Sequence, residues 1–241
     1  MPMNPRLLRP TPTGFNPRSL AGLAVWLDAS KESSIAYHTS SVNVATWSDL
    51  SGNGRNATQT TSNNAPAYTI GGFNGKNCLT FDGSNTSSGM NLGDLSAVFP
   101  SFGEYFCAFE ADSDTDYSIY RTRANTELLR DNSVNSRVGA FITTRTSLTL
   151  NFPSSGKALV SARANSSGTL IVRRNGGATE VTSTGNVYNA GNNHGIGNNL
   201  GGFAGLTFNG KIGEILVFNQ DIGAAARSRV ENYLKQKWGT P

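Results

Sequence analysis

Residues 211–218, with the sequence KIGEILVF, form a hydrophobic run close to the C-terminus. Its second half, residues 215–218, contains no polar residue, whereas a strand with one face in water alternates between apolar and polar side chains. We therefore expect a central strand that is buried on both faces. Such a strand needs further layers of structure to cover it.

A helical pattern follows this run. One face carries an apolar residue at every fourth position, and the other positions are mostly charged. The apolar stripe consists of Ala226, Val230, Leu234 and Trp238 with Tyr233 beside it, and Arg227, Arg229, Glu231, Lys235 and Lys237 are expected to face water. Gly223, after Asp221, is a suitable N-cap, and Gly239 is suited to a left-handed residue that ends the helix. The pattern predicts one amphipathic helix that lies on a sheet.

The composition favours a single all-β domain. The chain has 241 residues, of which 37% are hydrophobic, 15% are charged and 27 are Gly. Turn-forming residues separate short apolar runs, and no linker divides the chain after residue 20. Further strands are expected at residues 105–109, 117–120, 138–142, 148–150, 158–162 and 170–174. Asn175-Gly176 favours a tight hairpin turn, and residues 183–209 are expected to form a long loop.

Several stretches resemble the laminin-G-like, concanavalin-A-type jelly-roll domains. The C-terminal strand fits the family pattern G-x-I-x-E-x-x-x-[YF], and the helix ends in the pattern Y-L-x-x-K-W-G, here YLKQKWG at residues 233–239. LAVWLD at 23–28, WSDLSGNGRNA at 47–57 and LTFDG at 79–83 fit the same family in the expected order. The resemblance covers roughly residues 20 to 240. It implies a two-sheet antiparallel jelly-roll sandwich at residues 21–241, with one C-terminal helix.

The first 20 residues are expected to form an extended arm. Five prolines keep this segment extended, and no acidic residue precedes Asp28. We expect the arm to attach the domain to a partner through Arg6, Leu7, Leu8, Arg9, Phe15 and Arg18. A disordered tail is the alternative interpretation.

The resemblance to jelly-roll proteins of phage particles implies a non-enzymatic virion protein, such as a capsid decoration protein or a head or tail fibre module. Its expected partners are other virion proteins, the major capsid protein first, and it could form homo-oligomers. A lectin-like module that binds a surface glycan is the second hypothesis, and a glycan-active jelly-roll enzyme is the third.

Known catalytic patterns are missing, so we expect no enzymatic activity. His38 and His194 have no metal-ligand spacing to another His or Cys and are expected in exposed loops. Jelly-roll glycosidases present paired carboxylates in the pattern E-x-D-x-x-E, which this chain lacks. Glu104 and Glu110 share one strand face by parity alone.

Two acidic segments are candidate calcium sites. Asp112, Asp114 and Asp116 begin like a calcium loop, although Tyr117 and Arg123 stand where an EF-hand needs Gly and Glu. A solvated acidic turn is the stronger interpretation, and no cofactor other than calcium is expected. Residues 49–56 could likewise hold calcium or a sugar hydroxyl, but Asp and Asn also stabilise turns by bonding to their own backbone, which we expect here.

The remaining features bound the location and the partners. The formal net charge of +4 and a pI of about 9.2 permit contact with nucleic acid, but the basic residues outside the arm are scattered, so we do not expect it. No signal-peptide pattern and no membrane-spanning run are visible, which predicts synthesis in a host cytoplasm and a final location in the virion. Cys78 and Cys107 are expected to be buried thiols rather than a disulfide.

Overall fold

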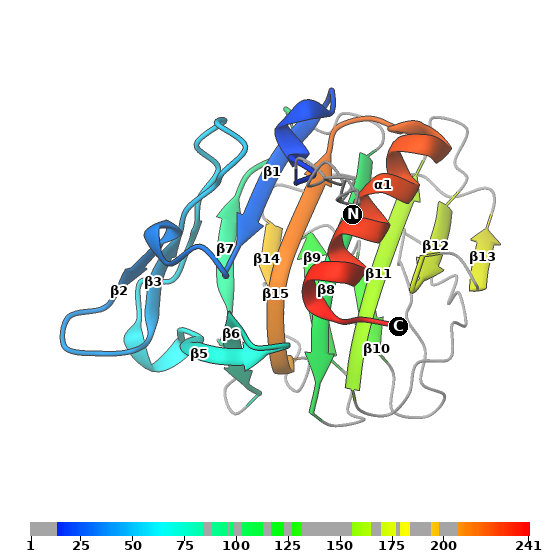
Figure 1. Ribbon diagram of the computed structural model, residues 1–241. Helices are drawn as coiled ribbons and strands as arrows, with labels where there is room; N and C mark the ends of the chain where they lie inside the picture. Colours follow the sequence, from blue (N-terminus) through cyan, green and yellow to red (C-terminus); the bar gives the residue numbers. More distant parts are fainter. Residues whose placement is uncertain are drawn as a thin grey trace, which may run out of the picture.

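The computed structural model describes residues 14–83, 88–95, 97–98, 103–112, 117–122, 127–131, 156–164, 170–176, 179–183, 194–197 and 207–241 (Figure 1). The strands expected at 138–142 and 148–150 lie outside these residues. The strands are β1 (Leu23–Asp28), β2 (Ile35–Tyr37), β3 (Val44–Trp47), β4 (Ala57–Thr58), β5 (Ala67–Phe73), β6 (Lys76–Asp82), β7 (Met90–Gly93), β8 (Gly103–Ala111), β9 (Tyr117–Thr122), β10 (Glu127–Asp131), β11 (Gly156–Ala164), β12 (Leu170–Arg174), β13 (Thr179–Ser183), β14 (His194–Ile196) and β15 (Asn209–Phe218). The helices are α1 (Gly223–Trp238) and the short 3-10 helices η1 (Pro17–Ser19), η2 (Glu32–Ser34) and η3 (Ser62–Asn64).

Two antiparallel sheets form a sandwich, as expected. In the described part of the chain, one sheet has eight strands in the order β13-β12-β11-β8-β15-β6-β5, with β1 also paired to β15. The other has seven strands in the order β10-β9-β14-β7-β4-β3-β2. β15 is central, because β8 runs along one of its edges while β6 and then β1 occupy the other.

The run at residues 215–218 is buried on both faces, which confirms the prediction made from its sequence. Ile215 and Val217 belong to the core between the two sheets. Leu216 and Phe218 belong to a second apolar cluster on the outer face, beneath α1. The continuous apolar sequence therefore reflects two cores that lie on opposite sides of one strand.

α1 covers the outer face of the eight-stranded sheet, in front of β15, β8 and β11 in Figure 1. Val230, Leu234 and Trp238 are fully buried there, which confirms the predicted stripe. Gly239 ends the helix in a left-handed conformation with φ 63°. At the other end the N-cap is Ile222, one residue before the predicted Gly223, and the Asp221 carboxylate accepts a hydrogen bond from the backbone N–H of Gly223.

Four further expectations about exposure are wrong. Arg227 and Glu231 are each only 2% exposed instead of facing water, because strands of the underlying sheet supply partners of opposite charge. The Lys237 side chain is only 14% exposed, because its ammonium group pairs with both Asp28 and Glu214. His194 is buried in β14 rather than lying in an exposed loop. The segment at residues 183–209 therefore contains a strand, which pairs with both β7 and β9.

Two turn predictions are confirmed. Asn175 and Gly176 both have positive φ, as a tight turn after β12 requires. The Asp49 carboxylate accepts hydrogen bonds from the backbone N–H groups of Trp26, Ser51 and Arg55. Because backbone N–H groups of the chain itself occupy the carboxylate, it stabilises the turn, as expected, and also ties the turn to β1.

The described end of the N-terminal arm packs against the sandwich. The rings of Phe15 and Tyr233 lie 5.1 Å apart, and the Arg18 Nε donates to the carbonyl oxygen of Leu50 over 2.6 Å. Pro17 is buried in η1. The expected contact residues Arg6, Leu7, Leu8 and Arg9 lie outside the described residues.

Candidate functional site

A buried polar network joins α1 to β1 and β15. The Glu214 carboxylate accepts four hydrogen bonds, from Trp26 Nε1 at 2.7 Å, Tyr233 Oη at 2.8 Å, Lys237 Nζ at 2.7 Å and Trp238 Nε1 at 2.9 Å. Asp28 shares the Lys237 ammonium at 2.6 Å. These residues are far apart in the sequence, and the helix brings three of the four donors to one carboxylate.

Burial dominates the electrostatics of this network. Burial and the nearby Asp28 charge raise the pKa of Glu214, and burial together with the Glu214 and Asp28 carboxylates raises the pKa of Tyr233 far above its usual range. Glu214 has no exposed surface, and its two oxygens each accept two bonds from the chain itself. The network therefore holds the helix on the sheet and offers no place to a ligand.

A second buried set of charges lies further along the helix. Arg227 forms an ion pair with Glu104, and its Nη2 also donates to Asp221 over 2.7 Å. Burial raises the pKa of Glu104 despite this pairing. Glu110, on the same face of β8, pairs instead with Lys211 at 3.4 Å. The two carboxylates have separate partners from the chain itself.

The other reactive side chains are also enclosed. The Tyr120 hydroxyl and His194 Nδ1 are hydrogen-bonded at 2.6 Å within the interior. Cys78 and Cys107 are buried free thiols, which confirms the prediction, and burial raises the pKa of Cys78 to about 11. A thiol with that pKa is almost entirely protonated at neutral pH and is a poor nucleophile.

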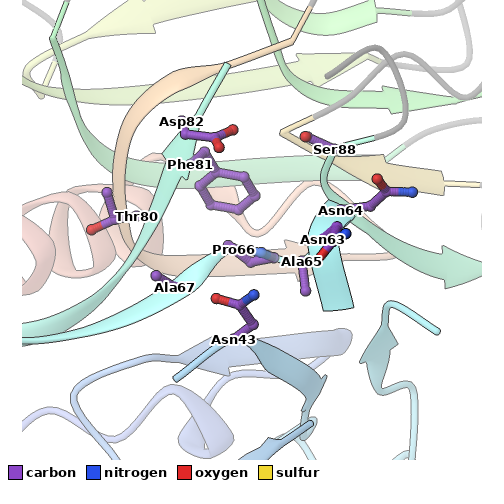
Figure 2. A pocket seen from close by; sticks show the side chains of 10 residues that line it. All are labelled: Asn43, Asn63, Asn64, Ala65, Pro66, Ala67, Thr80, Phe81, Asp82 and Ser88. Carbon is purple, nitrogen blue, oxygen red and sulfur yellow. The ribbon is translucent and has the colours of Figure 1, made fainter. Parts of the chain in front are cut away.

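A pocket of about 150 Å³ opens where the edges of the two sheets meet. Two backbone hydrogen bonds join the sheets here, from Val44 N to Pro66 O at 2.8 Å and from Tyr68 N to Val42 O at 2.9 Å. The lining comes from the residue just before β3, from η3 and the two residues after it, from β5 and β6, and from the segment before β7. It consists of Asn43, Asn63, Asn64, Ala65, Pro66, Ala67, Thr80, Phe81, Asp82 and Ser88 (Figure 2).

Three polar side chains of this lining have hydrogen-bonding groups to spare. Asn43 Nδ2 donates to the carbonyl oxygen of Ser62 at 2.8 Å, while its Oδ1 has no partner among the described residues. The exposed amide of Asn63 and the hydroxyl of Ser88 likewise make no hydrogen bond within the described part of the chain. The pocket can therefore both donate hydrogen bonds to a small ligand and accept them from it.

The apolar part of the pocket is held rigidly. The Phe81 ring lies amid the other lining side chains in Figure 2 and packs on Phe208, with ring centroids 5.7 Å apart. On another side it abuts Gly197, where an added Cβ would lie 2.4 Å from the ring. Phe81 is only 1% exposed and Pro66 is also buried, so these two side chains support the pocket from beneath. The half-buried Ala65 and Ala67 supply apolar surface beside the amide and hydroxyl groups, which is a common composition for a small-molecule site.

One candidate calcium residue lies near this pocket. Asp112 follows β8, and its backbone N–H donates to the carbonyl oxygen of Asn209, whose strand partner is Asp82. Asp114 and Asp116 lie outside the described residues, so the calcium prediction stays a prediction. Among the described residues, no group of three His, Cys, Asp or Glu side chains could hold a metal ion.

Sequence reasoning missed the pocket. Asn43, Asn63, Thr80 and Ser88 belong to four separate segments, and only Thr80 lies in one of the family stretches, LTFDG at 79–83, which implied the fold and no binding site. The one signal available was the number of Asn and Ser residues beside short strands. That signal occurs throughout this chain, so it could not have singled out these positions.

Comparison with solved structures supports the fold. Trypanosoma rangeli sialidase in complex with sialic acid matches 91% of this chain at 13% identity with a TM-score of 0.61, and the match spans 34% of the sialidase chain. Domain 4 of AbnA, an extracellular GH43 arabinanase from Geobacillus stearothermophilus, was solved with arabinotriose. It matches 88% of this chain and 99% of its own at 14% identity, with a TM-score of 0.60. The binding domain of Paraclostridial Mosquitocidal Protein 1 matches 93% of this chain and 56% of its own at 12% identity, also with a TM-score of 0.60.

These likenesses establish a jelly-roll-like β-sandwich. No protein-family model matches the sequence. The search of curated proteins also returned no match. This chain spans about a third of the sialidase that it resembles. In the described part of the chain, no helix is long and apolar enough to cross a membrane.

The prediction that this chain is not an enzyme is corrected by these comparisons. It rested on the absence of known catalytic patterns. However, the sialidase and the arabinanase are glycan-active enzymes, and regions of them share this fold at only 13% and 14% identity. At so low an identity catalytic residues need not follow known sequence patterns, so the missing motifs do not exclude catalysis.

Proposed function

We propose that this chain is a lectin-like module that binds a glycan in the pocket between the two sheet edges. The observation that carries the proposal is the set of polar groups that the described chain leaves unused, Asn43 Oδ1, the Asn63 amide and the Ser88 hydroxyl, beside the half-buried apolar side chains of Ala65 and Ala67. A sugar matches this surface because its hydroxyls both donate and accept hydrogen bonds, and its C–H groups pack on apolar side chains.

The structural neighbours favour a glycan over other small ligands. One was solved with sialic acid and another with arabinotriose, and the third is a binding domain. At 12% to 14% identity no residue role is carried over from them. The support is that this sandwich recurs in proteins that hold sugars, and that the pocket here has suitable chemistry.

The virion hypothesis now has less support than the glycan hypothesis. It rests on a sequence resemblance, and none of the neighbours described above is a phage protein. Attachment through the arm to a capsid protein remains a prediction. Both roles could occur in one protein, because the arm and the pocket are different segments of the chain.

Binding of defined oligosaccharides tests the proposal. Purified full-length protein is screened against arabinotriose, neutral hexose oligosaccharides and sialylated oligosaccharides, and binding is then quantified by titration calorimetry. Asn63→Ala and Ser88→Ala should each weaken binding by about two- to tenfold, because each removes one hydrogen bond. Glu32→Gln is the matched control, since this exposed side chain in η2 is not part of the lining. If no oligosaccharide binds, or if the variant that combines Asn63→Ala and Ser88→Ala binds as tightly as the unchanged protein, the proposal is wrong.

A further inference from the structure

The charges around the pocket define the ligand class more narrowly. Building on the glycan-binding function proposed above, we infer that the pocket accepts an uncharged sugar residue and discriminates against sugars that carry a carboxylate, such as sialic acid and uronic acids. The inference rests on three features: the charge of the lining, the charge of the neighbouring strand ends, and the size of the pocket.

The described lining residues include a carboxylate but no basic side chain. Asp82 is exposed at the end of β6, and none of the other lining residues is Lys, Arg or His. Residues 84–87, which connect Gly83 to Ser88, have the uncharged sequence SNTS. Proteins recognise carboxylates mainly through Arg and Lys, which donate charge-assisted hydrogen bonds. The described lining offers a carboxylate of a ligand no such partner.

A second acidic group lies at the same end of the sheet. β6 ends at Asp82, which is the strand partner of Asn209 at the start of β15, and Asp112 follows β8 on the other side of β15 (Figure 1). Lys211 lies 3.9 Å from Asp112 and also pairs with Glu110 at 3.4 Å. One ammonium group thus faces two carboxylates, and this group of three retains a negative charge. Such a rim repels an anionic ligand at low ionic strength, and salt weakens the repulsion.

The size of the pocket favours one sugar ring. Its volume of about 150 Å³ is well below the roughly 300 to 1,000 Å³ of sites for drug-sized ligands. One terminal ring can enter and place hydroxyls near Asn43, Asn63 and Ser88 while its C–H face meets Ala65 and Ala67. A carboxylate on that ring would come close to Asp82.

The decisive experiment compares ligands that differ in charge. The first pair is lactose and 3′-sialyllactose, and the second is trigalacturonic acid and its methyl ester, which has nearly the same shape without the charge. Titrations use the full-length protein in 50 mM and 500 mM salt. In each pair we expect the neutral member to bind at least tenfold more tightly in 50 mM salt, and we expect a smaller ratio in 500 mM salt.

Variants assign the discrimination to the pocket. Asp82→Asn keeps the shape of the side chain and removes its charge, so the ratio should fall by about two- to fivefold, whereas Glu32→Gln should leave it unchanged. Three results would overturn this inference: equal affinity for the two members of a pair, tighter binding of the acid, or an affinity ratio that changes neither with salt nor with Asp82→Asn. Each of these results would leave the glycan-binding function standing. If none of these sugars and no other oligosaccharide binds, the proposed function itself fails.

Discussion

The network beneath α1 and the pocket between the sheet edges are both polar, and both gather residues from distant segments, but they differ in where their hydrogen bonds go. Glu214 has no exposed surface and receives four donors from its own chain. Asn43 Oδ1 and the Asn63 amide lie at the surface of a pocket and have no partner in the described part of the chain. The raised pKa of Glu214 therefore reflects burial in a network that the chain itself satisfies, whereas the proposed ligand site rests on accessible polar groups without a partner.

Among the substitutions that test this comparison, removal of the Trp238 side chain should destabilise the protein most, because Trp238 belongs to the closed region, meaning the buried network beneath α1. The indole is fully buried against Phe73, with ring centroids 5.0 Å apart, and its Nε1 donates to Glu214. Trp238→Ala should lower the free energy of unfolding by about 3 to 5 kcal/mol, measured by denaturant titration. Asn232→Ala, an exposed position on the same helix, is the control. A loss below 1 kcal/mol would contradict the closed packing.

Gly213 tests the same contact from the side of the sheet. A Cβ added at this position would lie 2.5 Å from the Trp238 ring, so only glycine allows the indole to approach the backbone of β15 so closely. Gly213→Ala should cost about 1 to 3 kcal/mol of unfolding free energy through overpacking. Gly14→Ala is the matched control, because an added Cβ there would have no heavy atom within 4 Å. Equal effects of the two substitutions would show that Trp238 can move away without cost.

The sequence was most informative where the pattern is local. The apolar run at 215–218, the fourfold spacing of Val230, Leu234 and Trp238, and Gly239 each depend on neighbours a few residues away, and the structure agrees with all of them. Periodicity reports which face of an element is apolar, and this was enough to place the helix on a sheet.

Features that need partners from distant strands could not be predicted. Arg227 and Glu231 look like solvent-facing charges in the sequence, yet Glu104 and Arg173 come from β8 and β12 to meet them beneath the helix. His194 was expected in a loop because one histidine in a segment rich in Gly and Asn gives no strand signal. The pocket is even harder to predict from the sequence, because it forms only when the pairing of sheet edges brings four segments together.

Deletions in the N-terminal arm test whether the stability of the network beneath α1 depends on residues before β1. Phe15 packs on Tyr233, whose hydroxyl donates to Glu214, and the Arg229 guanidinium lies 5.3 Å from the Phe15 ring. Deletion of residues 1–18 should therefore cost at least about 1 kcal/mol more in unfolding free energy than deletion of residues 1–13, because the longer deletion removes this aromatic contact together with the buried Pro17 and the hydrogen bond from Arg18 to Leu50. Thermal unfolding of the two variants measures the difference. If both are equally stable, the Phe15 contact contributes nothing. The shorter deletion then tests the predicted partner contact without disturbing this packing.

Substitutions in the pocket between the sheet edges should have the smallest effect on stability. Asn63 is exposed, and its side chain makes no hydrogen bond to the described chain, so Asn63→Ala should change the unfolding free energy by less than about 0.5 kcal/mol. Asn43→Ala is the informative counterpart, because this side chain lines the same pocket but also donates to Ser62. We expect denaturant titration to show a loss of about 1 kcal/mol for Asn43→Ala, while glycan affinity falls for both variants. A large loss of stability in Asn63→Ala would mean that this side chain supports the fold, and the contrast between a closed network and an open pocket would then be wrong at this position.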